Sequence, residues 1–264
     1  MELAGRRVMI TGASRGIGKA IAERCAAAGA RVALVARSEG PLKELAASFA
    51  GATYFPTDLG EAAAVDGLIE RVEADGGPVD VLINNAGVAT GGDFADMAPD
   101  DIEQIYRLNL LTPVQLCRQV LPGMLARGQG HIVNVSSMAG CVGFPGMAAY
   151  ASSKAGLTHF TAILRADLRG RPVGTTLVEV GFVPTDMLAA VNEYRPSLLS
   201  KQRTDLLRLS VDVSVDELSQ AVADAISKGR RHVRLPRREA AYAVLPELGR
   251  RAIEVILTGV PHQD

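Results

Sequence analysis

A tyrosine and a lysine stand four residues apart in the segment Tyr150-Ala-Ser-Ser-Lys154. On a helix this spacing brings both side chains to one face. A positive charge beside a phenol stabilises the phenolate and lowers the pKa of the phenol from about 10. A phenol tuned in this way can exchange a proton with an alcohol or carbonyl oxygen, so the pair is a candidate acid and base. The same spacing is common by chance, and the hypothesis needs supporting residues.

A serine thirteen residues before the tyrosine provides that support. Ser137 follows the strand-like run 131–135, and open α/β sheets bind ligands at the carboxyl ends of such strands. Neighbouring residues of a strand point to opposite faces, so only one of Ser136 and Ser137 can face a substrate. We choose Ser137 because of its spacing to Tyr150.

The glycine-rich segment 11–18 is a candidate phosphate site between a predicted strand and a predicted helix. Such a turn presents backbone N–H groups and the positive end of the helix to an anion. Gly12 allows the tight turn, Gly16 lets a pyrophosphate approach the backbone, and Gly18 lets helix and strand pack closely. The segment lacks the Gly-Lys-Ser/Thr of an ATP-type loop. The alternative interpretation is a tight turn without a ligand.

Two arginines indicate which dinucleotide the turn would bind. Folds that bind NAD usually place an acidic residue at the end of the second strand. Here Ala36 takes that position, Arg37 follows it, and Arg15 lies in the glycine-rich turn. Two guanidinium groups that converge on the ribose would hold a 2′-phosphate through paired hydrogen bonds. We therefore predict NADP(H) as the cofactor; the alternative is two solvated surface arginines.

The elements that must position these residues follow from an alternation of short apolar runs and longer amphipathic stretches. This order is typical of βαβ units. We predict an α/β fold, a single Rossmann-type doubly wound domain over residues 1–264, with a parallel sheet of about seven strands and helices on both faces. Residues 1–187 would form the cofactor-binding and catalytic core, and residues 188–264 the substrate loop and the C-terminal elements.

The element boundaries are predicted from the same patterns. Strands are expected at 8–10, 32–35, before 58, at 79–83, 131–135 and 175–178, and near 232–235. Helices are expected at 17–28, 41–49, 61–74, 99–126 in two pieces, 148–168, 215–226 and 239–257. The pattern loosens between residues 192 and 208, where polar and charged side chains dominate.

In their order and spacing these motifs resemble the short-chain dehydrogenase/reductase family, from about residue 5 to residue 187. The remaining pieces that match are Asp58 after the third strand, Asn84-Asn85-Ala86-Gly87 after the fourth, Asn109, and the segment Gly181-Phe-Val-Pro-Thr185. The chain departs from the family pattern at Val180, where the family usually has a proline before the glycine. The departure removes a fixed φ angle and leaves the glycine in place.

The resemblance implies a role for each catalytic residue. Tyr150 would be the general acid in carbonyl reduction and the base in alcohol oxidation. Lys154 would hold the nicotinamide ribose and lower the pKa of the tyrosine, and Ser137 would hydrogen-bond the substrate oxygen. Asn109 would hold a water that links Lys154 to solvent. The predicted cofactor-binding residues are Gly12, Ser14, Arg15, Gly16, Ile17, Gly18, Arg37, Asp58, Leu59, Asn85, Ala86, Gly87, Tyr150, Lys154, Gly181, Val183 and Thr185.

Composition excludes several other classes of function. The 264 residues carry a net charge of −1, and binding to nucleic acid phosphates needs a surplus of basic residues. Three widely spaced cysteines and four scattered histidines predict neither a disulfide framework nor a metal site. The chain has no apolar run of the ~18 residues that a membrane span needs and no signal-like start, so we expect a cytoplasmic protein.

The substrate is predicted to be a hydrophobic carbonyl compound or its alcohol. It would contact the stretches 138–147 and 184–209, where apolar side chains suggest a pocket. These side chains belong to Gly143, Phe144, Pro145, Met147, Met187 and Leu188. The resemblance also implies a homodimer or homotetramer formed through the helices at 99–126 and 148–168.

Three questions stay open at this level. Because a fold does not imply an activity, a non-catalytic NADP(H)-sensing or scaffold protein is the alternative function. A sugar-nucleotide epimerase or dehydratase is disfavoured by length, since those enzymes usually add a larger C-terminal domain. The basic cluster at 230–238 could meet a membrane surface or an anionic substrate, and we favour an ordinary solvated face.

Overall fold

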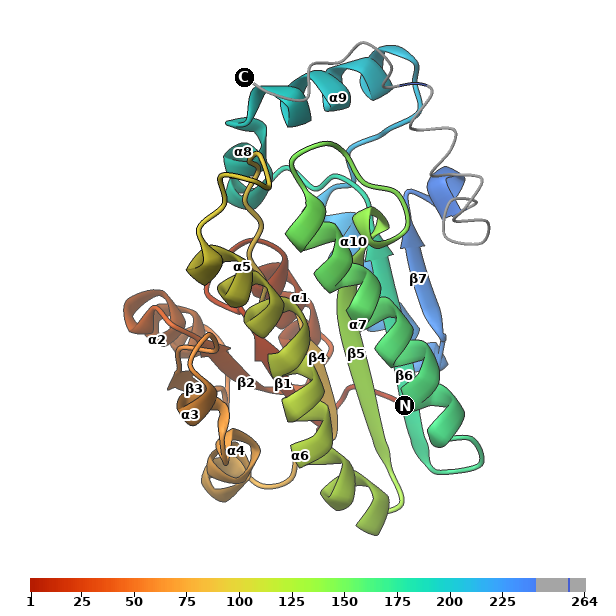
Figure 1. Ribbon diagram of the computed structural model, residues 1–264. Coiled ribbons are helices and arrows are strands. Elements are labelled where there is room, and N and C mark those ends of the chain that lie inside the picture. The colour runs from red at the N-terminus through yellow and green to blue at the C-terminus, as the bar shows by residue number, and fades with distance from the viewer. Residues whose placement is uncertain (241–255, 257–264) are drawn as a thin grey trace.

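A seven-stranded sheet with the order β3-β2-β1-β4-β5-β6-β7 forms the centre of the protein (Figure 1). Every neighbouring pair of strands is parallel. The chain leaves the centre first through β2 and β3 and then, on the other side, through β4 to β7, as in a doubly wound Rossmann-type fold. The predicted fold class and sheet are thus confirmed. The structure, a computed structural model, describes residues 1–240 and 256.

The strands are short, and the central ones are buried on both faces, as parallel sheets covered by helices require. The strands are β1 Arg7–Thr11, β2 Arg31–Ala36, β3 Thr53–Pro56, β4 Val81–Asn84, β5 Gly130–Ser137, β6 Val173–Val180 and β7 His232–Leu235. All carboxyl ends meet at the same edge of the sheet, and the residues that follow them are therefore close together in space.

Helices cover both faces of the sheet because alternate strand residues point to opposite sides. On β1, Val8 and Ile10 pack toward α1, α2 and α10, whereas Met9 packs toward α4, α6 and α7. The helices are α1 Gly16–Ala27, α2 Glu39–Ala47, α3 Ala62–Val65, α4 Leu68–Gly76, α5 Pro99–Tyr106, α6 Thr112–Ala126, α7 Ala148–Asp167, α8 Asp186–Asn192, α9 Arg195–Leu206 and α10 Val215–Lys228. Among the described residues, none of the helices is long and apolar enough to cross a membrane.

Short helical segments of other kinds interrupt this pattern. A π-helical segment, η1 (Arg107–Leu111), joins α5 to α6. Two 3₁₀ segments, η2 (Met138–Gly140) and η3 (Arg237–Glu239), follow β5 and β7. The segments η2 and η3 begin just beyond the carboxyl ends of β5 and β7. The segment η1 contacts the residues that follow β4 through Asn109.

One predicted helix and one loosely patterned region differ from the structure, and a second predicted helix is not tested by it. The helix expected at 61–74 is wrong as a single element, because Gly67 adopts a left-handed φ of 62° and separates α3 from α4. The loosely patterned region 192–208 contains the helix α9, which has a proline in its first turn, a favourable position for that residue. The helix expected at 239–257 falls almost entirely outside the described residues.

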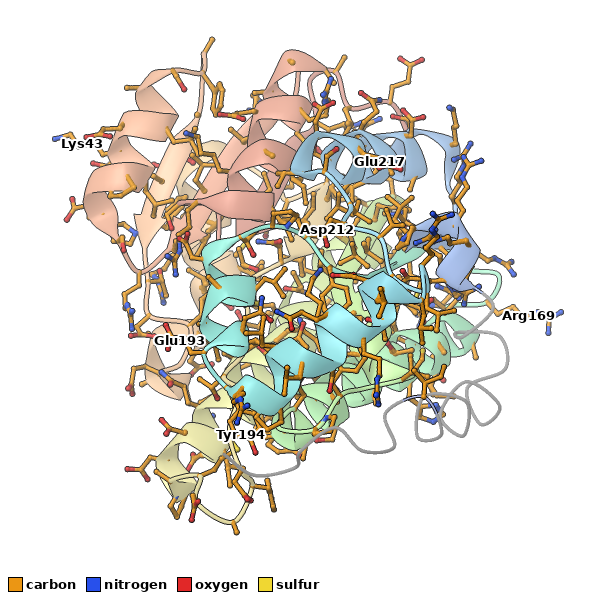
Figure 2. All side chains as sticks on the ribbon, turned by 90° about the horizontal axis from the view of Figure 1, so that it is seen from above. Lys43, Arg169, Glu193, Tyr194, Asp212 and Glu217 are labelled. Carbon is orange, nitrogen blue, oxygen red and sulfur yellow. The ribbon has the colours of Figure 1, made fainter. Side chains whose placement is uncertain are left out.

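The helices α8 and α9 lie across the carboxyl edge of the sheet. Figure 2 looks onto this edge and shows Tyr194 at the start of α9 and Asp212 beyond its end. Lys201 of α9 binds Asp212 at 3.2 Å and lies 4.9 Å from the centre of the Phe182 ring. The hydroxyl of Ser197 donates to the carbonyl of Pro145 at 2.8 Å. These contacts hold α9 over the segments that follow β5 and β6.

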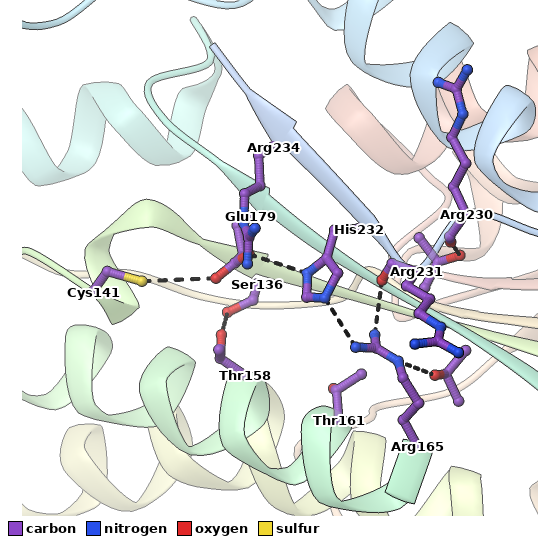
Figure 3. A network of polar contacts seen from close by, with 12 residues as sticks. Ser136, Cys141, Thr158, Thr161, Arg165, Glu179, Arg230, Arg231, His232 and Arg234 are labelled. Carbon is purple, nitrogen blue, oxygen red and sulfur yellow. Dashed lines mark hydrogen bonds and ion pairs between the residues drawn. The ribbon is translucent and has the colours of Figure 1, made fainter. Parts of the chain in front are cut away.

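A buried polar network ties β6, β7 and α7 together at one side of the sheet (Figure 3). Glu179 on β6 is only 1% exposed and accepts a hydrogen bond from Arg234 Nε at 2.6 Å. His232 Nδ1 lies 3.6 Å from the same carboxylate, and its other ring nitrogen meets Arg165 of α7 at 2.9 Å. The carboxylate of Glu179 thus anchors the edge strand β7.

Candidate active site

Ser137 and Tyr150 face the same cavity at the carboxyl edge of the sheet. Ser137 is the last residue of β5, and Tyr150 lies in the first turn of α7, which returns beside β5. The hydroxyl of Ser137 donates to the carbonyl of Val180 at 3.3 Å and accepts from the backbone N–H of Ala139 at 3.1 Å, which fixes it at the end of the strand beside the Tyr150 side chain. Ser136 points the other way, where its hydroxyl donates to the carbonyl of Lys154 at 2.9 Å and meets Thr158 at 2.8 Å. The strand alternation used to choose between the two serines therefore holds in the structure.

Lys154 lies one helical turn after Tyr150 and is almost fully buried. Its ammonium nitrogen Nζ donates to the carbonyl of Val135 at 3.0 Å and lies 5.9 Å from the centre of the Tyr150 ring. Burial lowers the pKa of Lys154 to about 8, because a charged group loses its hydration inside the protein.

The net pKa shift of Tyr150 is opposite in direction to the lowered pKa that the sequence predicted. Burial raises the pKa of Tyr150 above its usual value of 10, and the nearby hydroxyl of Ser137 only partly opposes that change. Loss of hydration around the phenol therefore decides the direction of the shift. As a result Tyr150 holds its proton at neutral pH, the form that an acid for carbonyl reduction needs.

Asn109 lies in the π-helical segment η1 and is fully buried. Its amide side chain accepts from the backbone N–H of Val88 at 2.9 Å and donates to the Val88 carbonyl at 2.9 Å and to Ser153 at 3.1 Å. These bonds position the segment that follows β4, a role that the sequence did not suggest. A methyl group on Gly87 would come within 2.9 Å of the Asn109 oxygen and 3.4 Å of Lys154 Nζ, so both groups converge on this glycine.

The glycine-rich turn between β1 and α1 fits a dinucleotide phosphate. Gly12 and Gly16 have φ angles of 68° and 55°, which glycine adopts without strain. A side chain on Gly18 would overlap the Gly12 carbonyl. None of the described side chains caps the first turn of α1, where Arg15 is extended, so its backbone N–H groups remain available to an anion.

The segment after β4 is joined to this turn by hydrogen bonds. The backbone N–H groups of Asn85 and Ala86 both donate to the Thr11 hydroxyl at 3.0 Å, and the Asn85 side chain donates to the Thr11 carbonyl at 2.9 Å. β1 and β4 are neighbours at the point where the strand order reverses, and this is the crevice where such sheets bind nucleotides.

The two arginines predicted to share a phosphate have different partners in the structure. Arg37 lies 3.8 Å from Asp58 and Arg15 lies 2.7 Å from Asp186 at the start of α8. The arginines therefore do not converge on a common group. Leu59 is buried beside the first pair, and its carbonyl accepts a hydrogen bond from the Thr112 hydroxyl at 2.8 Å.

A cavity of about 150 Å³ opens beside Ser137 and Tyr150. Its lining includes Val183 and Thr185 and, from the predicted substrate pocket, Gly143, Phe144, Met147, Met187 and Leu188. The lining is largely apolar, and Phe144 stacks on Phe182 with 5.6 Å between ring centres. Pro145 is not among the lining residues.

One lining residue that sequence reasoning missed is Glu239. Glu239 is 6% exposed and reaches the cavity from η3. In the sequence it lies about 100 residues after Ser137 and about 90 residues after Tyr150. No spacing or motif marks it, since only the packing of β7 against β6 brings it there. Cys141 is buried and contacts Glu179 rather than the cavity. Within the described part of the chain, no cluster of His, Cys, Asp and Glu could hold a metal ion.

Comparisons with known proteins identify the family to which this site belongs. A family model described as "short chain dehydrogenase" matches residues 6–196. The ketoacyl reductase HetN of Nostoc sp. is 40% identical over 185 residues, which is 69% of this chain and 64%, less than two thirds, of that protein. The 3-oxoacyl-[acyl-carrier-protein] reductase FabG of Escherichia coli is 33% identical over 195 residues, 73% of this chain and 80% of that protein.

Solved structures match over nearly the whole chain. A short-chain dehydrogenase/reductase from Burkholderia phymatum in complex with NAD has a TM-score of 0.82, 27% identity, and coverage of 97% of this chain and 96% of that one. A short-chain dehydrogenase from Sphingobium yanoikuyae in complex with NADPH has a TM-score of 0.79, 27% identity and 95% coverage of each chain. The chain belongs to the short-chain dehydrogenase/reductase family, whose oxidoreductases act on CH–OH and C=O groups with NAD or NADP.

Proposed function

We propose that the protein is an NADP(H)-dependent oxidoreductase that interconverts a hydrophobic ketone or aldehyde and the corresponding alcohol. The observation that supports this most directly is that Ser137 and Tyr150 line the same largely apolar cavity, with Lys154 buried one helical turn after Tyr150. A protein that only senses or scaffolds has no need of an acid and a base in its ligand cavity. The pair therefore favours catalysis over the non-catalytic alternative.

In the proposed reaction the nicotinamide supplies the hydride when it is bound, and the chain supplies orientation and the proton. The substrate oxygen accepts hydrogen bonds from Ser137 Oγ and Tyr150 Oη. Tyr150 donates its proton to this oxygen during reduction, and the Ser137 hydroxyl stabilises the negative charge that develops there. Lys154 holds a ribose hydroxyl and keeps a positive charge near the phenolate that remains. We propose that Asn109 belongs to the path by which Tyr150 regains its proton from solvent through Lys154. Its side-chain oxygen and Lys154 Nζ both lie close to Gly87.

We propose 3-oxoacyl compounds as the first substrates to test. The relatives HetN and FabG are named as ketoacyl and 3-oxoacyl-[acyl-carrier-protein] reductases. The apolar lining formed by Phe144, Met147 and Met187 suits an acyl chain.

The preference for NADP(H) rests on the end of β2. Ala36 stands where an acidic residue would hold the ribose of NAD, and Arg37 follows it. Arg37 is largely exposed and lies 3.8 Å from Asp58, and such an exposed ion pair costs little to exchange for a phosphate. Arg15, which is also exposed, would turn from Asp186 toward the same phosphate.

Replacement of the tyrosine tests the proposal. Tyr150→Phe removes the proton donor but keeps the ring, so we expect turnover of a 3-oxoacyl thioester to fall about 10³-fold. Binding of NADPH, followed by its fluorescence, should stay unchanged. Tyr106→Phe is the matched control, because Tyr106 lies on α5 and bonds Ser152 outside the cavity.

Two results would contradict the proposal. Turnover that survives in Tyr150→Phe would remove the mechanism. Tight NADPH binding without consumption of NADPH by any member of a broad panel of ketones and aldehydes would favour the sensing protein instead. A stronger rate with NADH than with NADPH would overturn the assignment of cofactor alone.

A further inference from the structure

Glu239 is a buried acid in a largely apolar cavity. Its side chain is only 6% exposed, and it lines the cavity that Ser137 and Tyr150 also line. Burial raises its pKa to about 7, well above the usual value of 4.5. The carboxylate therefore lies in a water-poor environment, where an unsatisfied oxygen is costly.

Only one oxygen of this carboxylate is used within the described chain. Oε1 accepts a hydrogen bond from the backbone N–H of Val211 at 3.3 Å. Among the described residues, Oε2 has no hydrogen-bond partner. It lies next to Gly181, and a Cβ atom added to that glycine would come within 2.9 Å of it. An ionised carboxylate can accept about four hydrogen bonds, so most of its capacity remains open. A buried polar group left open in this way fits a role in binding.

The sheet register sets the distance between this acid and the proposed catalytic pair. Ser137 on β5 lies beside Val180 on β6, and Val180 lies beside Leu235 on β7. Glu239 lies four residues after Leu235, at the end of η3, and its Oε2 lies against Gly181, which directly follows Val180. The carboxylate is therefore about one to two strand spacings, or ~5–10 Å, from Ser137. A substrate whose carbonyl meets Ser137 could thus reach Glu239 with a group several bonds away.

We propose that Glu239 is a second anchor for the substrate, and that it accepts a hydrogen bond from a hydroxyl or amide N–H several bonds beyond the reacting carbonyl. The inference rests on the proposed function, since the carbonyl end must occupy the Ser137–Tyr150 pair. It narrows the substrate class from any hydrophobic ketone to a ketone that carries a hydrogen-bond donor at its far end. The apolar walls between the two ends select for a hydrocarbon spacer.

A series of medium-chain methyl ketones tests this anchor. Each ketone is compared with its ω-hydroxyl derivative, which donates a hydrogen bond, and with its ω-methoxy derivative, which only accepts. The comparison is made about one pH unit above the pKa of Glu239, where its carboxylate is ionised and only accepts hydrogen bonds. At the chain length that reaches Glu239, we expect kcat/KM of the wild-type protein to favour the ω-hydroxyl ketone over the ω-methoxy ketone about tenfold, because a donor bound to a charged acceptor is strongly preferred.

Two variants separate binding from folding. Glu239→Gln can keep the acceptor for the Val211 N–H while it replaces the open oxygen with a donor, so the preference should reverse toward the ω-methoxy ketone. Glu239→Leu should abolish the preference and leave the ratio near one. Each preference is the ratio of the kcat/KM values of two substrates on the same variant. A loss of folded protein lowers both values equally and leaves the ratio unchanged. Glu193→Gln, an exposed change at the end of α8 (Figure 2), is the matched control.

Calorimetric binding of the ω-hydroxyl ketone and the unsubstituted ketone to the NADPH-loaded protein gives a readout that does not depend on turnover. Suppose that the wild-type protein reduces no ketone but binds the ω-hydroxyl ketone more tightly than the unsubstituted ketone, and that Glu239→Gln removes this difference in affinity. The anchor is then supported and the proposed reaction is contradicted. If ketones are reduced but the wild type shows no preference at any chain length, or the same preference in Glu239→Gln and Glu239→Leu, the anchor is overturned.

Discussion

Burial controls the charge state of both residues in the Tyr150/Lys154 pair. It raises the pKa of the phenol and lowers the pKa of the ammonium group to about 8. Tyr150 is therefore protonated over the whole neutral range, whereas Lys154 is the group that titrates just above it. The identity of these two residues could be read from a four-residue spacing, but the direction of the phenol's pKa change could not.

The rate of carbonyl reduction should fall as pH rises through about 8. Lys154 carries its positive charge below this pKa and loses it above, and with it the charge that stabilises the phenolate left on Tyr150. Single-turnover rates at saturating NADPH, measured between about pH 6 and pH 10, check this expectation. A midpoint near 10 or higher would assign the titration to Tyr150 instead.

The two neighbouring serines should differ in their effect on catalysis. Ser137→Ala removes a donor to the substrate oxygen, and we expect kcat to fall about 10²- to 10³-fold. Ser136→Ala is a matched control, because its hydroxyl bonds Lys154 and Thr158 away from the cavity. Steady-state kinetics and the melting temperature of both variants distinguish the two roles. An equal loss of kcat in Ser136→Ala would contradict the assignment.

At the scale of elements, the buried Glu179 network holds the edge strand β7, and with it η3 and Glu239, against β6. Burial alone would raise the pKa of Glu179, but the hydrogen bond from Arg234 and the nearby ring of His232 outweigh it and lower the pKa below its usual value. The network therefore helps to fix the place of β7, the strand that leads to η3 and Glu239.

Glu179→Ala should lower the free energy of unfolding by about 3 kcal/mol, because the change leaves Arg234 and His232 without their buried acceptor. A group whose pKa is lower in the folded state stabilises the protein above its unfolded pKa and loses this effect as pH falls through the folded pKa. Urea unfolding at neutral pH should therefore show a larger difference from the wild type than unfolding in acid. A difference that grows in acid would contradict the ion-pair account.

The element boundaries show where sequence patterns are sufficient. The runs at 32–35 and 131–135 were correctly predicted as strands. A short apolar run rich in β-branched residues is a pattern within a few residues, and it can be recognised without knowing the rest of the fold. The stretch 61–74 did not give one helix, because the left-handed conformation at Gly67 is favoured by its surroundings as well as by its residue type. The helix α9 carries no clear apolar face, and it forms where Lys201 and Ser197 bind the segments beneath it.

At the scale of the whole molecule, we propose a homodimer or homotetramer formed through the helices at 99–126 (α5, η1 and α6) and α7. Leu111 at the end of η1 and Ile163 on α7 are 47% and 49% exposed, and burying them against a second copy would be favourable. Light scattering at micromolar concentration should give a multiple of the 27.8 kDa chain mass. The double variant Leu111→Glu/Ile163→Glu should lower that mass; a monomeric wild type would contradict the proposal.

The sequence by itself determined the doubly wound sheet, the glycine-rich turn, and the order of the residues Ser137, Tyr150 and Lys154. These features depend on residue types and spacings within single elements. The tertiary structure alone decided the pKa direction of Tyr150, the different partners of Arg15 and Arg37, and the presence of Glu239 in the cavity. These depend on burial and on contacts between segments far apart in the chain, which no local pattern encodes.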